Sequence, residues 1–306
     1  MIDFVIAGTF KAASSTLSYE LGKHPKIFIP TPKDPHYYVG KLFSTLTGPA
    51  DFLALQDKYS IYDRVDFEAL YAESGDAIRG DATPLYLYCH NHAIKAIKAD
   101  NPETKIIIIL RNPADRAFSN YNHNVKDGYE KRSFSECIDT WEENEVFPLH
   151  PFFHYVRAGF YEAQVAAWQE AFEHVKIITY EQVCNDVDLV LNEIAEFLEI
   201  EANFKPREEI IRLNKSGSPR YPVLHRFILE ENSIKKVLRP FYRALLRNPY
   251  TRKRVAERVK NFNIESQQMT VEERSRLNAL YASDISRVSA RVGLDLVKLW
   301  KIDETL

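Results

Sequence analysis

A lysine and a cluster of hydroxyl groups follow the first apolar stretch of the chain. Residues 2–8 (IDFVIAG) predict a buried strand that ends at Gly8, and Lys11 follows in the next turn. Three hydroxyl residues then open a segment with helical spacing: Ser14, Ser15 and Thr16. The N–H groups of such a junction and the helix dipole favour negative charge, so the stretch predicts an anion site. It departs from the P-loop pattern G-x-x-x-x-G-K-[ST], because the lysine comes too early and Ala13 replaces the second glycine.

A second group of polar residues follows the clearest strand. KIIIIL at 105–110 is an unbroken apolar run, which is typical of a parallel strand covered on both faces. Asn112 and Pro113 then predict the start of a helix, with asparagine as the cap. Arg111 stands directly at the end of the strand, and Ser119 lies two turns into the helix. An arginine fork matches the geometry of a phosphate group, and a serine can donate a hydrogen bond beside it.

Each group also has a purely structural interpretation. A strand, a glycine, a turn and a helix with a lysine need not bind an anion at all. Arg111 would then pair with an acidic side chain, and Ser119 would pack in the core. Ligands of open α/β sheets, however, bind outside the carboxyl ends of the strands. Two anion sites at two strand ends therefore predict a ligand with two separated phosphate groups.

The remaining sequence predicts the elements that position these groups. Strands are predicted at 2–8, 24–29, within 77–87, at 105–110 and at 175–180, and helices at 14–23, 91–100, 113–126, 133–144, 160–174 and 186–199. Strands that alternate with helices indicate a parallel sheet with helices on its faces. We therefore expect an α/β, P-loop-like three-layer fold, with a central parallel β-sheet flanked by helices and a helical C-terminal extension.

The chain is expected to form a single domain over residues 1–306. Residues 1–222 would form the α/β core and residues 223–306 the helical part, which is predicted to be free of strands from about 223 to 293. A capping box and a glycine stop mark the last long helix: Thr270 with Glu273, and Gly293.

Composition indicates a soluble globular protein, with 45% hydrophobic and 27% charged residues among 306. The three cysteines lie far apart with no C-x-x-C spacing, which favours a reducing compartment. The first strand begins almost at Met1, which leaves no room for a signal peptide, and no apolar run approaches the ~20 residues of a membrane span. A cytoplasmic location is expected, and no cluster has the spacing of metal ligands.

Positive charge is concentrated late in the chain. Between residues 205 and 260, 16 lysines and arginines stand against 5 acidic residues, a local net charge of +11, whereas the rest carries −14. This segment is either the binding surface for an anionic partner or a solvated helical face. Within it, residues 234–254 interleave apolar and basic residues, so they either contact an anionic membrane peripherally or form an ordinary helix packed on the core.

Six stretches, taken in order, resemble the sulfotransferases that use 3′-phosphoadenosine 5′-phosphosulfate (PAPS), nearest the heparan-sulfate-type and bacterial branch. Residues 8–17 are similar to the family's phosphosulfate loop, G-x-x-K-x-G-T-T-x-L. Residues 111–121 match its 3′-phosphate motif, R-x-P-x-x-R-A-x-S-x-Y, at every defined position. The other similar stretches are KDPHYY (33–38), GDATPLYL (80–87), RAGFYEAQVAAWQEAF with TYEQV (157–172 and 179–183) and YASDISRVSARVGLDLVKLW (281–300).

The resemblance assigns roles to residues. It implies that Lys11 contacts the bridging oxygen of PAPS and supports the leaving group, with 3′-phosphoadenosine 5′-phosphate (PAP) as the product. It implies a further loop over the nucleotide, NKSGSPR at 214–220. The residues implied to hold the nucleotide are Phe10, Lys11, Ala12, Ala13, Ser14, Ser15, Thr16, Arg111 and Ser119, with Lys215, Ser216, Gly217 and Arg220 from the late loop.

Three positions depart from the family pattern. Ala13 replaces the loop glycine, and alanine is strained there if the backbone needs a positive φ. Ala82 replaces a lysine that helps to hold the sulfate in relatives, and Asp34 replaces the usual glutamate.

The group that takes the proton of the acceptor hydroxyl is left open by the sequence. Asp34 aligns with the glutamate that serves as base in the heparan-type enzymes, and His36, two residues on, has an ordinary pKa of ~6.5 that suits proton transfer. In a structural interpretation, Asp34 holds Lys33 or Lys11 and His36 packs against Tyr37.

We therefore expect a PAPS-dependent sulfotransferase that acts on a hydroxyl of a carbohydrate, a glycolipid or another small metabolite, with no nucleic-acid partner. The regions 39–76 and 129–156 are expected to shape the acceptor pocket. A nucleotide kinase of related fold and a non-catalytic nucleotide-binding protein are the alternatives. The sequence does not indicate an oligomeric state.

Overall fold

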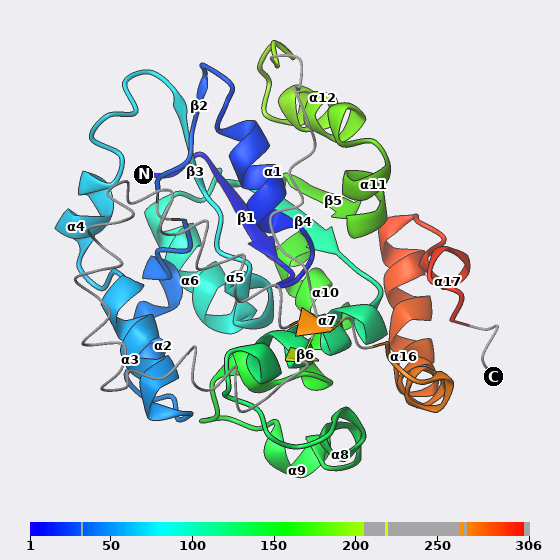
Figure 1. Cartoon of the computed structure of the whole chain (residues 1–306). Coiled ribbons are helices and arrows are strands. Elements are labelled where there is room, and N and C mark those ends of the chain that lie inside the picture. The colour runs from blue at the N-terminus through cyan, green and yellow to red at the C-terminus, as the bar shows by residue number, and fades with distance from the viewer. Residues whose placement is uncertain (32, 205–217, 220–263, 266–267, 303–306) are drawn as a thin grey trace, which may run out of the picture.

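Five parallel strands form the centre of the molecule. The computed structural model describes residues 1–31, 33–204, 218–219, 264–265 and 268–302. Its strands are β1 (Phe4–Gly8), β2 (Ile27–Phe28), β3 (Ile78–Asp81), β4 (Lys105–Leu110) and β5 (Val175–Thr179). They pair in the order β2-β3-β1-β4-β5, and every pair is parallel (Figure 1). The strands that precede the two predicted anion sites, β1 and β4, are therefore direct neighbours.

Helices cover both faces of this sheet (Figure 1). Ile6 and its neighbours on one face pack against Leu17 of α1 (Ser14–Leu21) and Ile194 of α12 (Val187–Phe197). On the other face, Val5 packs in a cluster that includes Trp168 of α10 (Glu162–Ala171). The burial of both faces explains why the strands are continuous apolar runs. The predicted α/β three-layer fold is confirmed.

The remaining described helices connect and flank these elements. They are α2 (Gly40–Phe43), α3 (Ala50–Tyr59), α4 (Arg64–Ala69), α5 (Leu85–Tyr88), α6 (His90–Asp100), α7 (Pro113–Lys126), α8 (Phe134–Asp139), α9 (Trp141–Asn144), α11 (Tyr180–Asn185), α16 (Val271–Val292) and α17 (Leu296–Leu299), with 3₁₀ turns η1 (Tyr37–Val39), η2 (Pro151–Phe153) and η3 (Arg157–Gly159). Among the described helices, none combines the length and the apolar character that a membrane span requires.

The predicted helix boundaries hold where capping residues mark them. The Asn112 side chain accepts hydrogen bonds from the first turn of α7, with Pro113 at the first helical position. At the start of α16, Thr270 and Glu273 form the predicted capping box, and Gly293 ends the helix with φ 68°.

Three predicted elements differ from the structure. The strand at 24–29 shortens to Ile27–Phe28, because the chain turns at His24, whose carbonyl accepts a hydrogen bond from the Ile27 N–H. The helix at 133–144 divides into α8 and α9. The stretch predicted to be strand-free contains β7 (Ile264–Glu265), which pairs antiparallel with β6 (Ser218–Pro219). A two-residue strand is shorter than the runs from which periodicity can predict a strand.

The C-terminal helix α16 is fastened to the core by buried polar contacts. The Tyr281 hydroxyl donates to the Val156 carbonyl at 2.7 Å. The buried Asp284 carboxylate accepts a hydrogen bond of 2.7 Å from the Tyr161 N–H at the start of α10. Gly159 allows this packing, because a Cβ there would lie 2.7 Å from the Tyr281 ring. These contacts explain the pattern shared by two of the motifs, which lie more than a hundred residues apart.

Candidate active site

The loop that follows β1 has the backbone of an anion site. Gly8 brings it close to α5, since a Cβ there would lie 2.2 Å from the Leu87 Cβ. Lys11 and Ala13 both adopt left-handed conformations, with φ 68° and 65°. Ala13 is the N-cap of α1 and provides no capping side chain, so the N–H groups of the first turn stay available to an anion.

The side chains of this loop divide into two sets. Ser14 is buried, Ser15 and Thr16 are half-buried, and no hydroxyl of the three donates a hydrogen bond to another described residue. Ala12, by contrast, is fully buried in the core, and Phe10 packs against Phe152 at 5.8 Å between ring centroids. Of the predicted nucleotide-binding residues, these last two present main-chain atoms only.

Arg111 meets the same loop from β4. Its Nη1 donates a hydrogen bond of 2.6 Å to the Lys11 carbonyl oxygen, across a hundred residues of sequence. The guanidinium lies 4.3 Å from the centroid of the Tyr180 ring. The Arg111 carbonyl in turn accepts a hydrogen bond from the Tyr161 hydroxyl at 2.9 Å. Ser119 is buried on α7, which follows directly. The two predicted anion groups therefore lie at one edge of the sheet.

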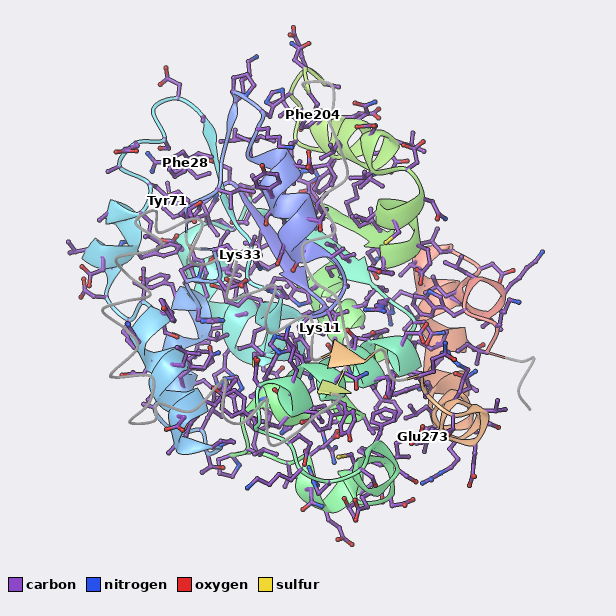
Figure 2. The ribbon with its side chains drawn as sticks, viewed as in Figure 1. Lys11, Phe28, Lys33, Tyr71, Phe204 and Glu273 are labelled. Atoms are coloured by element: carbon purple, nitrogen blue, oxygen red, sulfur yellow. The ribbon has the colours of Figure 1, made fainter. Side chains whose placement is uncertain are left out.

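Positive charge is concentrated here without a matching carboxylate. Lys11 lies just beyond the tip of the β1 arrow (Figure 2). Its pKa falls to about 8 because of burial and the like charges of Arg111, Lys126 and Lys33, with Asp127 opposing the shift. Within the described part of the chain, no carboxylate forms an ion pair with Lys11 or Arg111. An anion bound here would relieve this repulsion.

A second strained loop carries the candidate bases. Asp34 and His36 have φ values of 62° and 56°, so four of the six described non-glycine residues with positive φ lie in these two loops. Such strain persists where the surrounding structure holds it and is often linked to function. The Asp34 carboxylate pairs with the Lys33 ammonium at 2.8 Å, the contact expected from the structural interpretation.

His36 is held as a neutral ring. Its Nδ1 lies 3.3 Å from the Ser60 Oγ, and that hydroxyl donates its proton to the Gln56 carbonyl. Nδ1 must therefore carry the hydrogen, which leaves the lone pair on Nε2. Burial lowers the His36 pKa to about 4. The ring packs against Phe43 at 5.0 Å rather than against Tyr37, so this detail of the structural interpretation is wrong.

Asp81, which ends β3, organises the turn that follows. It is fully buried and accepts hydrogen bonds from the Thr83 hydroxyl at 2.6 Å and the Tyr86 hydroxyl at 2.8 Å. Burial raises its pKa to about 7 despite these hydrogen bonds. Ala82, next to it, is buried in the core cluster beside Ala12, so this position supplies no cation.

Some of the predicted site cannot be placed. Lys215, Ser216, Gly217 and Arg220 lie outside the described residues, as does the segment 234–254. The strand β6 between them packs beside α7, on the side of the molecule that carries Lys11 (Figures 1 and 2). In the described residues, no group of three or more histidine, cysteine or acidic side chains is arranged to hold a metal ion.

Sequence reasoning missed Tyr180 and the aromatic residues around Phe152. Tyr180 directly follows β5, the strand beside β4, so its place at a strand end was a usable signal. Phe152 belongs to a region with no regular periodicity, and its partners are distant in sequence. No local pattern reveals such contacts.

Comparison with known proteins identifies the family. The model of the family described as "Sulfotransferase domain" matches residues 45–220, more than half of the chain. The chain therefore belongs to the sulfotransferase family of transferase enzymes, as the sequence predicted, and the kinase alternative is not favoured.

Individual relatives are distant but consistent. Carbohydrate sulfotransferase 15 of Mus musculus is 22% identical over 300 residues, which cover 78% of this chain and 51% of the relative. The Homo sapiens protein of the same name is 21% identical over 294 residues, with the same two shares. The chain thus spans about half the length of the curated relatives it matches. The crystal structure of a sulfotransferase from Alicyclobacillus acidocaldarius aligns with a TM-score of 0.74 and 26% identity, covering 98% of this chain and 99% of that one.

The left-handed conformation of Ala13 predicts that Ala13→Gly stabilises the protein. An L-residue in this region costs about 1–2 kcal/mol, and the greater flexibility of unfolded glycine returns about 0.5–1 kcal/mol. We expect the free energy of unfolding in urea to rise by up to about 1 kcal/mol. Ala12→Gly is the matched control and should destabilise, because Ala12 is buried and its φ is not positive. Equal destabilisation by both variants would contradict the strain.

Proposed function

We propose that the protein transfers a sulfuryl group from PAPS to a hydroxyl group of an acceptor. The observation that carries this proposal is the uncompensated charge where two neighbouring strands end. Lys11 from the β1 loop and Arg111 from β4 lie together with no carboxylate paired to either in the described residues. Family membership supports the choice of a phosphosulfate over other anions.

The residues present fit the two phosphate groups of PAPS. The uncapped N–H groups at the start of α1 and the hydroxyls of Ser14, Ser15 and Thr16 would hold the 5′ end. Arg111 and Ser119 would hold the 3′-phosphate, since guanidinium and hydroxyl donors suit phosphate oxygens. Lys215, Ser216, Gly217 and Arg220 are proposed on the resemblance alone.

Lys11 would stabilise the charge that appears on the leaving group. PAPS supplies the activated sulfuryl group, and negative charge grows on the oxygen from which that group departs. An ammonium fixed at this point acts more strongly than in water because the site is partly desolvated. The lowered pKa of Lys11 is that of the ligand-free protein, and a bound anion would raise it and keep the ammonium protonated.

Two groups are proposed for removing the proton of the acceptor hydroxyl. Asp34 has a carboxylate on a strained loop beside Lys33, which lies in the electrostatic surroundings of Lys11. His36 has a lone pair on Nε2, but its pKa of about 4 makes it a weak base at neutral pH. This difference favours Asp34.

The acceptor side rests on weaker support. The name of the mouse relative, carbohydrate sulfotransferase 15, supports an acceptor with hydroxyl groups. The finer expectations from the sequence, a cytoplasmic location and peripheral contact of residues 234–254 with a membrane, stay predictions.

Binding of PAP tests the nucleotide assignment. PAP at about 100 times its Kd should stabilise the protein by ~2.7 kcal/mol, whereas ATP with Mg²⁺ should give a much smaller thermal shift. Arg111→Ala should weaken PAP binding roughly 10- to 100-fold, as expected for loss of a charged hydrogen bond. Arg287→Ala, an exposed arginine of α16, is the control and should bind PAP normally. A preference for ATP, or normal PAP binding by Arg111→Ala, would overturn the proposal.

Replacement of the candidate bases separates their roles. Asp34→Asn should lower kcat with PAPS by about 10²–10⁴-fold, the usual contribution of a general base, with PAP affinity nearly unchanged. Asparagine tolerates a left-handed backbone, so the loop should persist. His36→Asn is the matched variant and should retain most turnover. Wild-type turnover by Asp34→Asn, with loss in His36→Asn, would transfer the role to His36.

A further inference from the structure

Two distant segments form one wall beside the proposed phosphosulfate site. Residues 39–76 and 129–156, called here the wall segments, are joined by main-chain hydrogen bonds. The Thr47 N–H donates to the Pro148 carbonyl at 2.7 Å, and the His150 N–H donates to the Thr47 carbonyl at 2.9 Å. Their side chains therefore form a continuous surface.

The inner part of this wall is aromatic. Phe152 is its centre, with ring-centroid distances of 5.8 Å to Phe52, 5.8 Å to Phe10 and 5.4 Å to His123. Tyr129 lies 5.4 Å from Phe52. We call these five rings the aromatic wall. Phe152, His123 and Tyr129 keep exposed surface, whereas Phe10 and Phe52 are buried behind them.

The aromatic wall lies next to the group that would support sulfuryl transfer. Phe10 immediately precedes Lys11 in the chain. His123 stands one turn before Lys126 and Asp127, and both of these charges act on the Lys11 ammonium. A molecule resting on the aromatic wall would therefore lie close to the sulfur that Lys11 helps to activate.

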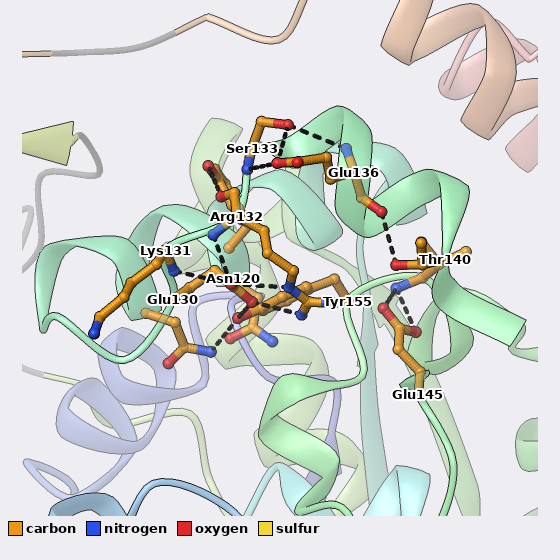
Figure 3. A network of polar contacts seen from close by, with 12 residues as sticks. Asn120, Glu130, Lys131, Arg132, Ser133, Glu136, Thr140, Glu145 and Tyr155 are labelled. Carbon is orange, nitrogen blue, oxygen red and sulfur yellow. Dashed lines mark hydrogen bonds and ion pairs between the residues drawn. The ribbon is translucent and has the colours of Figure 1, made fainter. Parts of the chain in front are cut away.

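The wall segments are strongly acidic. Residues 39–76 contain 3 lysines and arginines against 7 acidic residues, and residues 129–156 contain 2 against 6, so each segment carries a net charge of −4. Two of the five cations are already paired, Arg64 with Glu68 at 2.7 Å and Arg132 with Glu130 at 2.8 Å (Figure 3). The histidines add no charge at neutral pH, since burial lowers the pKa of His150 to about 3 and that of His154 to about 4.

We propose, on the basis of the proposed function, that the acceptor is an uncharged molecule that carries its hydroxyl on an aromatic or apolar group. Aromatic side chains bind such a group by stacking and by burying apolar area. A polysaccharide rich in uronate or sulfate would meet a combined charge of −8 on the two wall segments, and like-charge contact disfavours a partner. The acceptor class would then differ from a polyanionic carbohydrate.

The test compares two probes with the intact chain and PAPS at low salt. 2-Naphthol represents the uncharged aromatic class, and chondroitin represents a uronate-bearing polymer. We expect kcat/KM for 2-naphthol to exceed that for chondroitin, per disaccharide, by at least tenfold. No turnover of 2-naphthol, or equal or better use of chondroitin, overturns the proposal.

Variants of one loop test the aromatic wall itself. Phe152→Leu keeps an apolar side chain but removes the ring, and it should raise KM for 2-naphthol at least fivefold while PAP affinity stays unchanged. Phe147→Leu is the matched control, because this exposed ring on the same loop contacts Tyr88 and His154 instead. An unchanged KM in Phe152→Leu would contradict the role of the wall.

These results separate the two proposals. Failure of the protein to bind PAP would remove the proposed function and the acceptor class with it. Normal PAP binding and turnover, combined with a preference for chondroitin, would remove the acceptor class alone.

Discussion

The structure depends on the close approach of two positive side chains that no carboxylate in the described residues neutralises. The Arg111 guanidinium donates to the carbonyl of Lys11, so the two cations are held at one edge of the sheet despite their repulsion. Burial and this repulsion lower the pKa of Lys11, which means that the ligand-free site costs free energy. A dianionic or more highly charged ligand would convert that cost into affinity. The left-handed residues Lys11 and Ala13 add to the strain.

The C-terminal helices contribute by fixing the arginine. Tyr161 donates to the Arg111 carbonyl, and its own N–H is bound by Asp284 of α16. Beside it, the Asn112 amide donates to the Trp300 carbonyl at 3.1 Å. A chain of buried hydrogen bonds thus runs from the last described helices to the end of β4. This arrangement gives a physical reason for the distant motif at 281–300, which contributes no side chain to the nucleotide directly.

Sequence reasoning could predict what strand ends and caps determine. Lys11 and Arg111 were predicted to share one edge because ligands gather at the carboxyl ends of parallel strands, and the positive φ of Ala13 was foreseen from the glycine it replaces. Asp34 and His36 could not be given a geometry, because a left-handed residue before and after Pro35 follows from tertiary contacts. The aromatic wall was also invisible, since Phe152 meets Phe52 and His123 through folding alone.

The most direct measurement is the titration of the Lys11 ammonium by NMR, using ¹³Cε-labelled lysine and Lys11→Gln to assign the resonance. The account predicts a midpoint near 8 in the ligand-free protein, well below the ordinary 10.5, and a clear rise when PAP is bound. A midpoint near 10.5 that does not respond to PAP would contradict the claim that uncompensated charge at this edge is what the site provides.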